Sequence, residues 1–302
     1  MIQIVATPGS GDGRARATAE ALAEAIRARG HPVGIEVFHD LHRLARWSRS
    51  CARSFSLLIC VGGDATMSAA AAAAIRHRVP FLPVPSGFGN LFAHAFGHTD
   101  DIPAAIDCLE AGDVAWVDAG MSHGEIFLSH ESFGVLDEIQ NAVEARPDQP
   151  RARWLRLLAY WRAGLRLLAG GAASSFQVEV DGTLVAKRAV LVTVANVRAY
   201  GDVLALTPDA SPVDGLLDVF VIPRTSRLGL CRRLIALLLR LPRRGDDVLL
   251  FRGRRVAVSR PGQFREDIQV VPAALPVMVR RGWLNGMRAT QREAEPALAG
   301  RS

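Results

Sequence analysis

The sequence predicts an α/β N-terminal domain of the nucleotide-binding kind, followed by a mostly β, sandwich-like C-terminal domain. Up to about residue 120, short apolar runs that suit buried parallel strands alternate with segments of helical periodicity. From Val114 onward the pattern changes to short strands of alternating polarity. We therefore expect domains at residues 1–120 and 121–285, and a flexible tail at residues 286–302.

The composition is that of a globular protein with a basic, arginine-rich surface. The 302 residues are 49% hydrophobic and carry a formal net charge of +6, and Lys187 is the only lysine. This charge favours anionic partners. A nucleotide and an acidic membrane surface fit better than nucleic acid, because the sequence contains no nucleic-acid-binding motif. No run of about 20 apolar residues lacks charge, so we expect no transmembrane helix.

Four cysteines, Cys51, Cys60, Cys108 and Cys231, lie in apolar or helical segments without the spacing of metal ligands. They indicate buried thiols in a reducing compartment. Because Met1 leads directly into a predicted strand, we expect no signal peptide. These features predict a cytoplasmic protein.

The N-terminal domain is expected to consist of strand–loop–helix units. The first glycine-rich turn, at residues 7–13, has neither the G-x-G-x-x-G spacing of a dinucleotide site nor the lysine of a Walker loop. The predicted strands are residues 2–6, 33–38, 55–61 and 81–84, and the predicted helices are residues 14–29, 41–50, 66–78 and 102–110.

Two glycine-rich loops follow neighbouring buried strands in this domain. The first begins at Gly62-Gly63-Asp64, and the second runs from Pro85 to Asn90. Both should emerge at the carboxyl edge of the sheet, where open α/β folds bind ligands. Glycine permits close backbone approach, and a helix start presents amides to an anion. The loops therefore predict a phosphate site, although the same glycines would also serve turn geometry alone.

Asp64 is the unexpected member of the first loop, because a carboxylate repels phosphate. It could hold Mg²⁺, or it could accept a proton from an attacking hydroxyl group. The sequence pattern alone leaves both roles open.

The C-terminal domain is predicted to be rich in strands, with two basic amphipathic segments between them. Residues 151–168 and 228–241 each combine a leucine-rich face with several arginines, which suits either a membrane interface or a surface helix. The predicted strands are residues 127–130, 176–180, 189–194, 217–222, 248–251, 256–259, 268–271 and 277–279.

Several of these motifs resemble those of a known superfamily. Gly62-Gly63-Asp64-Ala65-Thr66 resembles the GGDGT signature shared by diacylglycerol kinases, sphingosine kinases and NAD kinases. The loop from Pro85 to Asn90 resembles the P-x-G-T-x-N loop of the same proteins. The turn that contains Ser10 resembles their N-P-x-S-G turn.

The resemblance continues through the second half of the chain. Residues 129–139 are similar to the family's opening segment of the second domain, and residues 194–201 to its A-N-x-x-Y-G-G stretch. Residues 208–218 (PDASPVDGLLD) give the best local match, to P-x-A-x-x-D-D-G-x-L-D, and lose only the first of the paired acids, at Val213. The fold implied is that of the diacylglycerol kinase and NAD kinase group.

The resemblance implies an ATP-dependent lipid kinase of the diacylglycerol kinase type, with Mg²⁺, acting in lipid metabolism and phospholipid biosynthesis. Asp64 would be catalytic and a metal ligand, and Asp214 would hold a structural cation unless it is a plain turn residue. The expected partners are the nucleotide and a lipid substrate at the membrane, where the protein would be peripheral, and a homodimer is compatible with the sequence. The residues implied to contact the nucleotide are Gly62, Gly63, Thr66, Ser10, Gly87 and Asn90.

The sequence also departs from the family at positions that bear on chemistry. Ala65 replaces the third glycine of GGDGT and would crowd the loop if its φ were positive, and Phe88 replaces a threonine. The family's Asp-Gly-Glu triplet, implied to supply a catalytic acid, is absent, and Glu266 or Asp267 would have to substitute. Two alternatives therefore stay open, a lipid- or nucleotide-binding protein with impaired catalysis and an NAD kinase.

Overall fold

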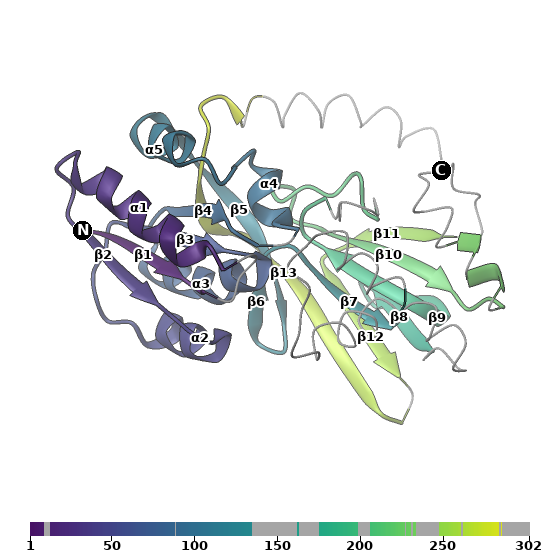
Figure 1. The fold of residues 1–302 in the computed structure, drawn as a ribbon. Helices are drawn as coiled ribbons and strands as arrows, with labels where there is room; N and C mark the ends of the chain where they lie inside the picture. Colours follow the sequence, from purple (N-terminus) through teal and green to yellow (C-terminus); the bar gives the residue numbers. More distant parts are fainter. Residues whose placement is uncertain are drawn as a thin grey trace. The chain divides into compact units, whose positions relative to one another are not determined.

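The chain divides into two compact units, which are described separately. Unit 1 comprises Met1–Val117 and resumes at Ala274, and unit 2 comprises Asp118–Ala273. The sequence ranges differ, because they assign everything from residue 121 to 285 to the second domain. The computed structural model describes residues 1–8, 13–87, 89–134, 162, 175–198, 206–226, 228–230, 232–233, 248–260, 262–283 and 285 (Figure 1).

Unit 1 contains a parallel sheet in the order β2-β1-β3-β4, with the end of β13 beside β4. The apolar runs found in the sequence form its central strands, and β1, β3 and β4 are buried along their whole length. Its elements are β1 (Ile2–Ala6), α1 (Ala15–Arg27), β2 (Val33–Val37), α2 (Leu41–Ser50), β3 (Leu57–Gly62), α3 (Asp64–His77), β4 (Phe81–Pro85), α4 (Leu91–Ala95) and α5 (Ile102–Ala111).

The helices of unit 1 pack through small and aliphatic side chains. α1 buries a stripe that includes Leu22 and Ile26 against the core of the sheet. α3 is rich in alanine, and it lies close to α2, where the Ser48 hydroxyl donates to the Ala70 carbonyl at 3.3 Å. The short helix α4 has no counterpart among the predicted helices, because five residues are too few for a periodic signal.

Unit 2 is antiparallel and follows the strand order β11-β10-β9-β8-β12-β13, with β7 paired to β9. Its core consists of the inward-facing residues of these strands, chiefly valines. The predicted α/β and β-rich halves are thus confirmed. The strands are β5 (Asp113–Ser122), β6 (Glu125–Phe127), β7 (His130–Gly134), β8 (Phe176–Val180), β9 (Thr183–Ala195), β10 (Leu217–Pro223), β11 (Leu249–Gly253), β12 (Arg255–Arg260) and β13 (Phe264–Val279).

The last strand differs from the prediction in an instructive way. Residues 268–271 and 277–279, predicted as two strands, belong to the single 16-residue strand β13. Pro272 and Pro276 suggest breaks in the sequence, but the strand passes through both and turns locally at Ala273, whose φ is 46°. β13 begins in unit 2 and ends in unit 1, and this is why the chain returns to the first unit at Ala274.

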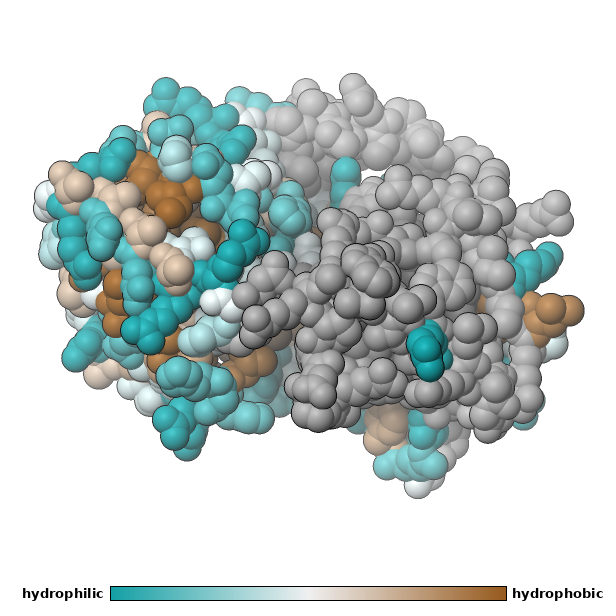
Figure 2. All heavy atoms as spheres, in the orientation of Figure 1, coloured by the Kyte–Doolittle hydropathy of each residue, from teal (hydrophilic) through white to brown (hydrophobic). Residues whose placement is uncertain are grey.

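The small hydrophobic patches on the surface and the buried cysteines are typical of a globular protein. On the face drawn in Figure 2, hydrophobic residues over the N-terminal elements form small patches separated by hydrophilic ones. Cys51, Cys60 and Cys108 are buried free thiols, and burial raises the pKa of Cys108 to about 11, whereas Cys231 lies outside the described residues. Within the described part of the chain, no helix has the length and apolar composition needed to cross a bilayer.

Candidate active site

The two glycine-rich loops contact each other in unit 1, because the strands that precede them are parallel neighbours. β3 and β4 end in register, with Gly62 opposite Pro85, and the Ser86 amide donates to the Gly62 carbonyl at 2.9 Å. A Cβ atom on Gly87 would lie only 2.6 Å from the Cα atom of Gly63. The two backbones therefore approach more closely than a side chain at position 87 would permit.

Asn90 closes the second loop. Its backbone has a φ of 49° and its residue is 8% exposed. The side-chain Oδ1 accepts a hydrogen bond from the Gly87 amide at 2.9 Å, and Nδ2 donates to the Gly87 carbonyl at 2.8 Å. Asparagine suits this position because it tolerates the left-handed conformation and bonds nearby backbone.

Asp64, the first residue of α3, binds the start of the neighbouring helix α4. Its Oδ2 accepts from the Leu91 amide and its Oδ1 from the Phe92 amide, both at 2.9 Å. A carboxylate at the amino end of a helix is stabilised by the orphan amides and by the helix dipole. Asp64 thus ties the first loop to the second, and each oxygen keeps a lone pair for a further partner.

Thr66 supports the first loop from the core. It is 2% exposed, and its hydroxyl lies 2.7 Å from the hydroxyl of Thr7 at the end of β1. A Cβ atom on Gly62 would lie 2.6 Å from the Cβ atom of Thr66. The structure therefore gives Thr66 a packing role between two strand ends.

The amino end of α3 has the features of an anion site. Its N-cap is Gly63, which has no side chain to bond the first-turn amides. Six of the predicted site residues, Gly62, Gly63, Asp64, Thr66, Gly87 and Asn90, thus belong to one loop pair. Ser10 and Phe88 lie outside the described residues.

The expected crowding at Ala65 does not occur. Ala65 is the second residue of α3, is exposed, and is not among the residues with positive φ. The condition for that crowding, a positive φ at Ala65, is therefore not met, because the third position of the signature is already helical here.

In unit 2 the structure brings together an acidic cluster that sequence reasoning identified only in part. Asp118, at the centre of β5, is 3% exposed, and its carboxylate accepts from the Gly215 amide at 2.7 Å and the Ala273 amide at 2.8 Å. It joins three segments, including the point where β13 turns. The only sequence signal was an acid within a largely apolar strand. Asn196, fully buried, donates to the Asp118 carbonyl at 2.8 Å.

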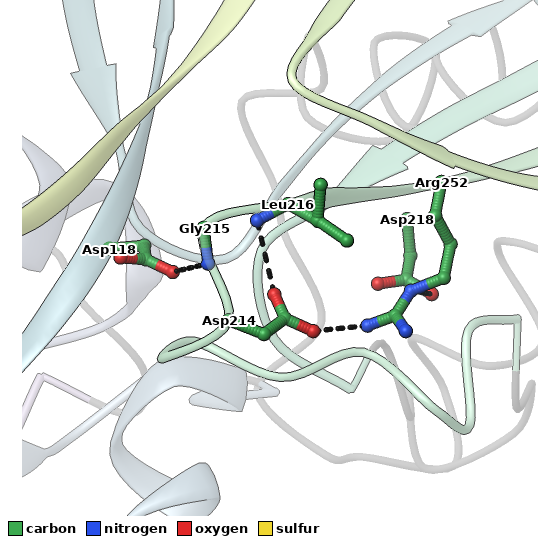
Figure 3. A network of polar contacts seen from close by, with 6 residues as sticks. All are labelled: Asp118, Asp214, Gly215, Leu216, Asp218 and Arg252. Carbon is green, nitrogen blue, oxygen red and sulfur yellow. Dashed lines mark hydrogen bonds and ion pairs between the residues drawn. The ribbon is translucent and has the colours of Figure 1, made fainter. Parts of the chain in front are cut away.

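Asp214 and Asp218 flank the turn that leads into β10, which we call the acid turn (residues 214–218). The Asp214 Oδ1 accepts from the Leu216 amide at 3.1 Å, and its Oδ2 accepts from the Arg252 guanidinium. The same guanidinium lies 3.3 Å from an oxygen of Asp218, from Nε to Oδ1 (Figure 3). Burial raises the pKa of Asp214 and raises that of Asp218 to about 6, against the lowering effect of Arg252.

Arg252 occupies the place beside Asp214 where the sequence predicted a structural cation, and the metal-binding role of Asp214 stays a prediction. Both oxygens of Asp214 are engaged, one by a backbone amide and one by Arg252. Among the described residues, no group of three or more acidic, histidine or cysteine side chains could hold a metal ion. The guanidinium already bound there repels a second cation, so the acid turn with Arg252 in place is a poor site for Mg²⁺.

Glu266, predicted as a catalytic acid, is 2% exposed on β13 and holds the turn between β5 and β6. It accepts from the Ser122 hydroxyl at 2.7 Å and from the His123 amide at 2.9 Å, and it pairs with the His123 ring. Glu266 lies seven positions before Ala273 in the strand, a span of roughly 23 Å. These contacts favour a structural role, and the catalytic role stays a prediction.

In the comparison with known proteins, each half of the chain matches the model of a protein family. The model of the diacylglycerol kinase catalytic domain matches residues 2–122, and that of the YegS C-terminal NAD kinase beta sandwich-like domain matches residues 135–279. A crystal structure described as a diacylglycerol kinase from Bacillus anthracis str. Sterne shares the fold, with a TM-score of 0.65, 16% identity, and coverage of 93% of this chain and 97% of the other.

Curated relatives carry the same names. A diacylglycerol kinase of Mycobacterium tuberculosis (strain CDC 1551 / Oshkosh) is 27% identical over 92% of this chain and 94% of its own. A diacylglycerol kinase of Bacillus subtilis (strain 168) is 28% identical over 58% of this chain and 57% of its own. A "Probable lipid kinase YegS-like" protein of Pseudomonas fluorescens is 28% identical over 72% of each chain. The chain belongs to the diacylglycerol kinase-like family of lipid kinases, with a diacylglycerol kinase catalytic domain followed by a YegS-type C-terminal domain.

Proposed function

We propose that this protein is an ATP-dependent lipid kinase that transfers the γ-phosphate of Mg–ATP to a hydroxyl group of a diacylglycerol-like lipid. The observation that carries the proposal is the contact between the two glycine-rich loops. The two backbones are so close that a Cβ atom added to Gly87 would lie 2.6 Å from the Cα atom of Gly63, so the surface here consists of main chain. Such a surface binds phosphate oxygens through amides rather than through a lysine or an arginine.

The amino end of α3 supports the same placement of the phosphates. Gly63 leaves the first-turn amides without a side-chain cap, and the helix dipole favours negative charge there. Phosphoryl transfer needs mainly alignment and charge neutralisation, and the first-turn amides of α3 would contribute to both. Asn90 would help by fixing the conformation of the second loop.

Asp64 would serve the reaction through the lone pairs that Leu91 and Phe92 do not use. Two amide hydrogen bonds fix the orientation of the Asp64 carboxylate. In that orientation it would hold the Mg²⁺ that accompanies ATP, or accept the proton of the attacking lipid hydroxyl.

The test is a direct assay with a variant that leaves the fold intact. Purified protein is incubated with γ-labelled ATP, Mg²⁺ and a total lipid extract, and labelled lipids are identified. Gly63→Ala is the informative variant, because its Cβ would meet Gly87 only at 3.5 Å, an ordinary contact, yet would cover the amides. We expect at least a tenfold loss of ATP affinity with unchanged melting temperature. Glu24→Gln, on the exposed face of α1, is the control. Absence of any nucleotide binding by the parent would overturn the proposal.

A second function, lipid or nucleotide binding without turnover, is favoured by a specific observation. Both acids predicted to act in catalysis have structural hydrogen bonds, Asp64 to α4 and Glu266 to a β-turn. Calorimetry that detects ATP binding, combined with no labelled lipid in the assay, would support this alternative over the kinase.

The lipid substrate implies contact with a membrane surface. The basic segments at residues 151–168 and 228–241 would supply it, and both lie largely outside the described residues. Co-sedimentation with anionic and neutral liposomes tests this, and equal binding to both would argue against an electrostatic contact.

A further inference from the structure

The acid turn concentrates negative charge in a partly dehydrated place. The side chains of Asp214 and Asp218 are 19% and 10% exposed, and the charge of Asp118 acts on Asp214 as a repulsive neighbour. Asp209 acts in the same way on Asp218. Carboxylates that are close together and shielded from water need a cation nearby, because their mutual repulsion is poorly screened.

Among the residues that the structure describes, the cation that contacts both acids is the guanidinium of Arg252. It binds Asp214 through Nη2 and Asp218 through Nε, so one planar group contacts both acids (Figure 3). A guanidinium is suited to this task, because its donors form a rigid fork and it stays charged at all physiological pH values.

The position of Arg252 follows from strand pairing. β10 and β11 are antiparallel, and Arg252 lies directly opposite Asp218 in their register. Cross-strand partners have neighbouring Cβ atoms, so the ion pair with Asp218 is built into the sheet. The guanidinium then extends beyond the strand end to Asp214, where Gly215 has a φ of 71° and turns the chain.

The contact also fixes the backbone that Asp118 binds. Gly215 follows Asp214 directly, and its amide donates to the Asp118 Oδ2 at 2.7 Å. Release of Asp214 would therefore free the turn on which one of the two hydrogen bonds of the Asp118 carboxylate depends.

We propose that the guanidinium of Arg252 supplies the positive charge that the acid turn needs, in place of a divalent metal ion, so that unit 2 holds this turn without bound metal. The Oδ2 of Asp218 has no hydrogen-bond partner in the part of the chain that the structure describes. Removal of Arg252 would leave this oxygen and those of Asp214 exposed to a cation from solution. The proposal concerns the stability of unit 2, and its test does not depend on the kinase reaction.

The test uses the full-length protein without nucleotide or lipid, and it measures the melting temperature. The parent should melt at the same temperature in EDTA, in Mg²⁺ and in Ca²⁺. Arg252→Ala should melt about 5 °C or more lower in EDTA, because it leaves two partly buried carboxylates without a cationic partner. Millimolar Ca²⁺ or Mg²⁺ should restore part of this loss, whereas NaCl of equal ionic strength should not.

Two further variants keep the experiment decisive. Arg254→Ala changes an exposed arginine two residues away, for which only backbone hydrogen bonds are described, and it should show no dependence on divalent ions. If Arg252→Ala does not fold, the double variant Arg252→Met with Asp214→Asn lowers the charge of the turn, and it should fold without added metal.

A simple loss of an ion pair would lower the melting temperature equally in all buffers, and this outcome would contradict the proposal. A parent protein that is destabilised by EDTA would also overturn it. Failure of the double variant to fold in metal-free buffer would contradict it as well.

Discussion

The glycine loops of unit 1 and the acid turn of unit 2 both place carboxylates at a backbone turn, but they neutralise the charge by different means. Asp64 is met by two backbone amides at the start of α4. Asp214 and Asp218 are met by one side chain, that of Arg252. The first arrangement depends on how closely two main chains approach, and the second depends on the identity of one residue.

The two regions should therefore lose stability through different kinds of substitution. Backbone amides are present whatever the side chains, so the glycine loops should be sensitive to added volume. A guanidinium can be removed by one substitution, so the acid turn should be sensitive to lost charge. Glycine-to-alanine changes test the first statement, and the Arg252 variants test the second.

Gly87→Ala should have the largest effect. Its Cβ would lie 2.6 Å from the Cα of Gly63 and 2.9 Å from the Oδ1 of Asn90, so the loops must separate. We expect a loss of about 3 kcal/mol in the free energy of unfolding, together with loss of ATP binding. Denaturant titration measures the first and calorimetry the second. Gly63→Ala, in the partner loop but without a clash, should lose little stability, and equal losses in the two variants would refute the steric explanation.

A fall in pH should change the stability of the two units in opposite directions. Each unit buries a titratable group, and the pKa is lowered in one and raised in the other. His98 in unit 1 is 5% exposed, its Nε2 lies 2.9 Å from the Met278 carbonyl, and burial lowers its pKa to about 4. Unfolded, it takes up a proton near pH 6.5, so its contribution is constant above pH 6.5 and is lost as the pH falls towards 4. The loss is about 3 kcal/mol. The raised pKa of Asp218 acts in the opposite direction in unit 2.

Stability measured between pH 7 and pH 4 tests this on the parent and on His98→Gln, which can still donate to the Met278 carbonyl but does not titrate. The variant should lose less stability on acidification than the parent. Parallel pH profiles for the two proteins would remove His98 as the cause.

Asp64→Asn should have a smaller effect on stability. Asparagine offers one carbonyl oxygen in place of two, so either the Leu91 or the Phe92 amide loses its acceptor, at a cost of about 1–2 kcal/mol. Asp101→Asn is the matched control, because among the described residues the Asp101 side chain accepts a single backbone hydrogen bond, from Ala104 at the start of α5, and asparagine caps equally well. If both variants lose the same stability, the double contact of Asp64 is unimportant. A large loss of turnover in Asp64→Asn alone would support the catalytic role.

Much of unit 1 could be predicted from sequence, because buried parallel strands are continuous apolar runs and the loops between them carry glycine. The strands β1, β3 and β4 and the adjacency of the two glycine-rich loops follow from those signals, whereas the close approach of Gly63 to Gly87 was seen only in the structure. The hydrogen bonds of Asp64 could not be predicted, because α4 is only five residues long and its start lies 27 residues further along the chain.

The acid turn was less predictable for a related reason. Asp214 was singled out because residues 208–218 resemble a family motif that contains an Asp-Gly turn. Its cation, however, comes from Arg252, 38 residues later on a different strand, and the sequence contains many other arginines. Asp118 was missed because its two amide partners, at Gly215 and Ala273, depend on the turn and on the left-handed residue within β13.

Ala65→Gly should have the smallest effect, and it distinguishes the loop expected from the family signature from the helix found here. A glycine at this position would relieve strain if the residue had a positive φ, and the variant would then bind ATP more tightly. Ala65 is instead the second residue of α3, exposed and right-handed, so glycine should only lower helix propensity, by about 0.5–1 kcal/mol. Ala72→Gly, inside the same helix, provides the reference for a full interior penalty. Denaturant titration of the three proteins should place Ala65→Gly between the parent and Ala72→Gly, with ATP affinity unchanged or weaker, whereas a stability gain or tighter ATP binding in Ala65→Gly would mean that the first loop adopts the family's positive-φ geometry.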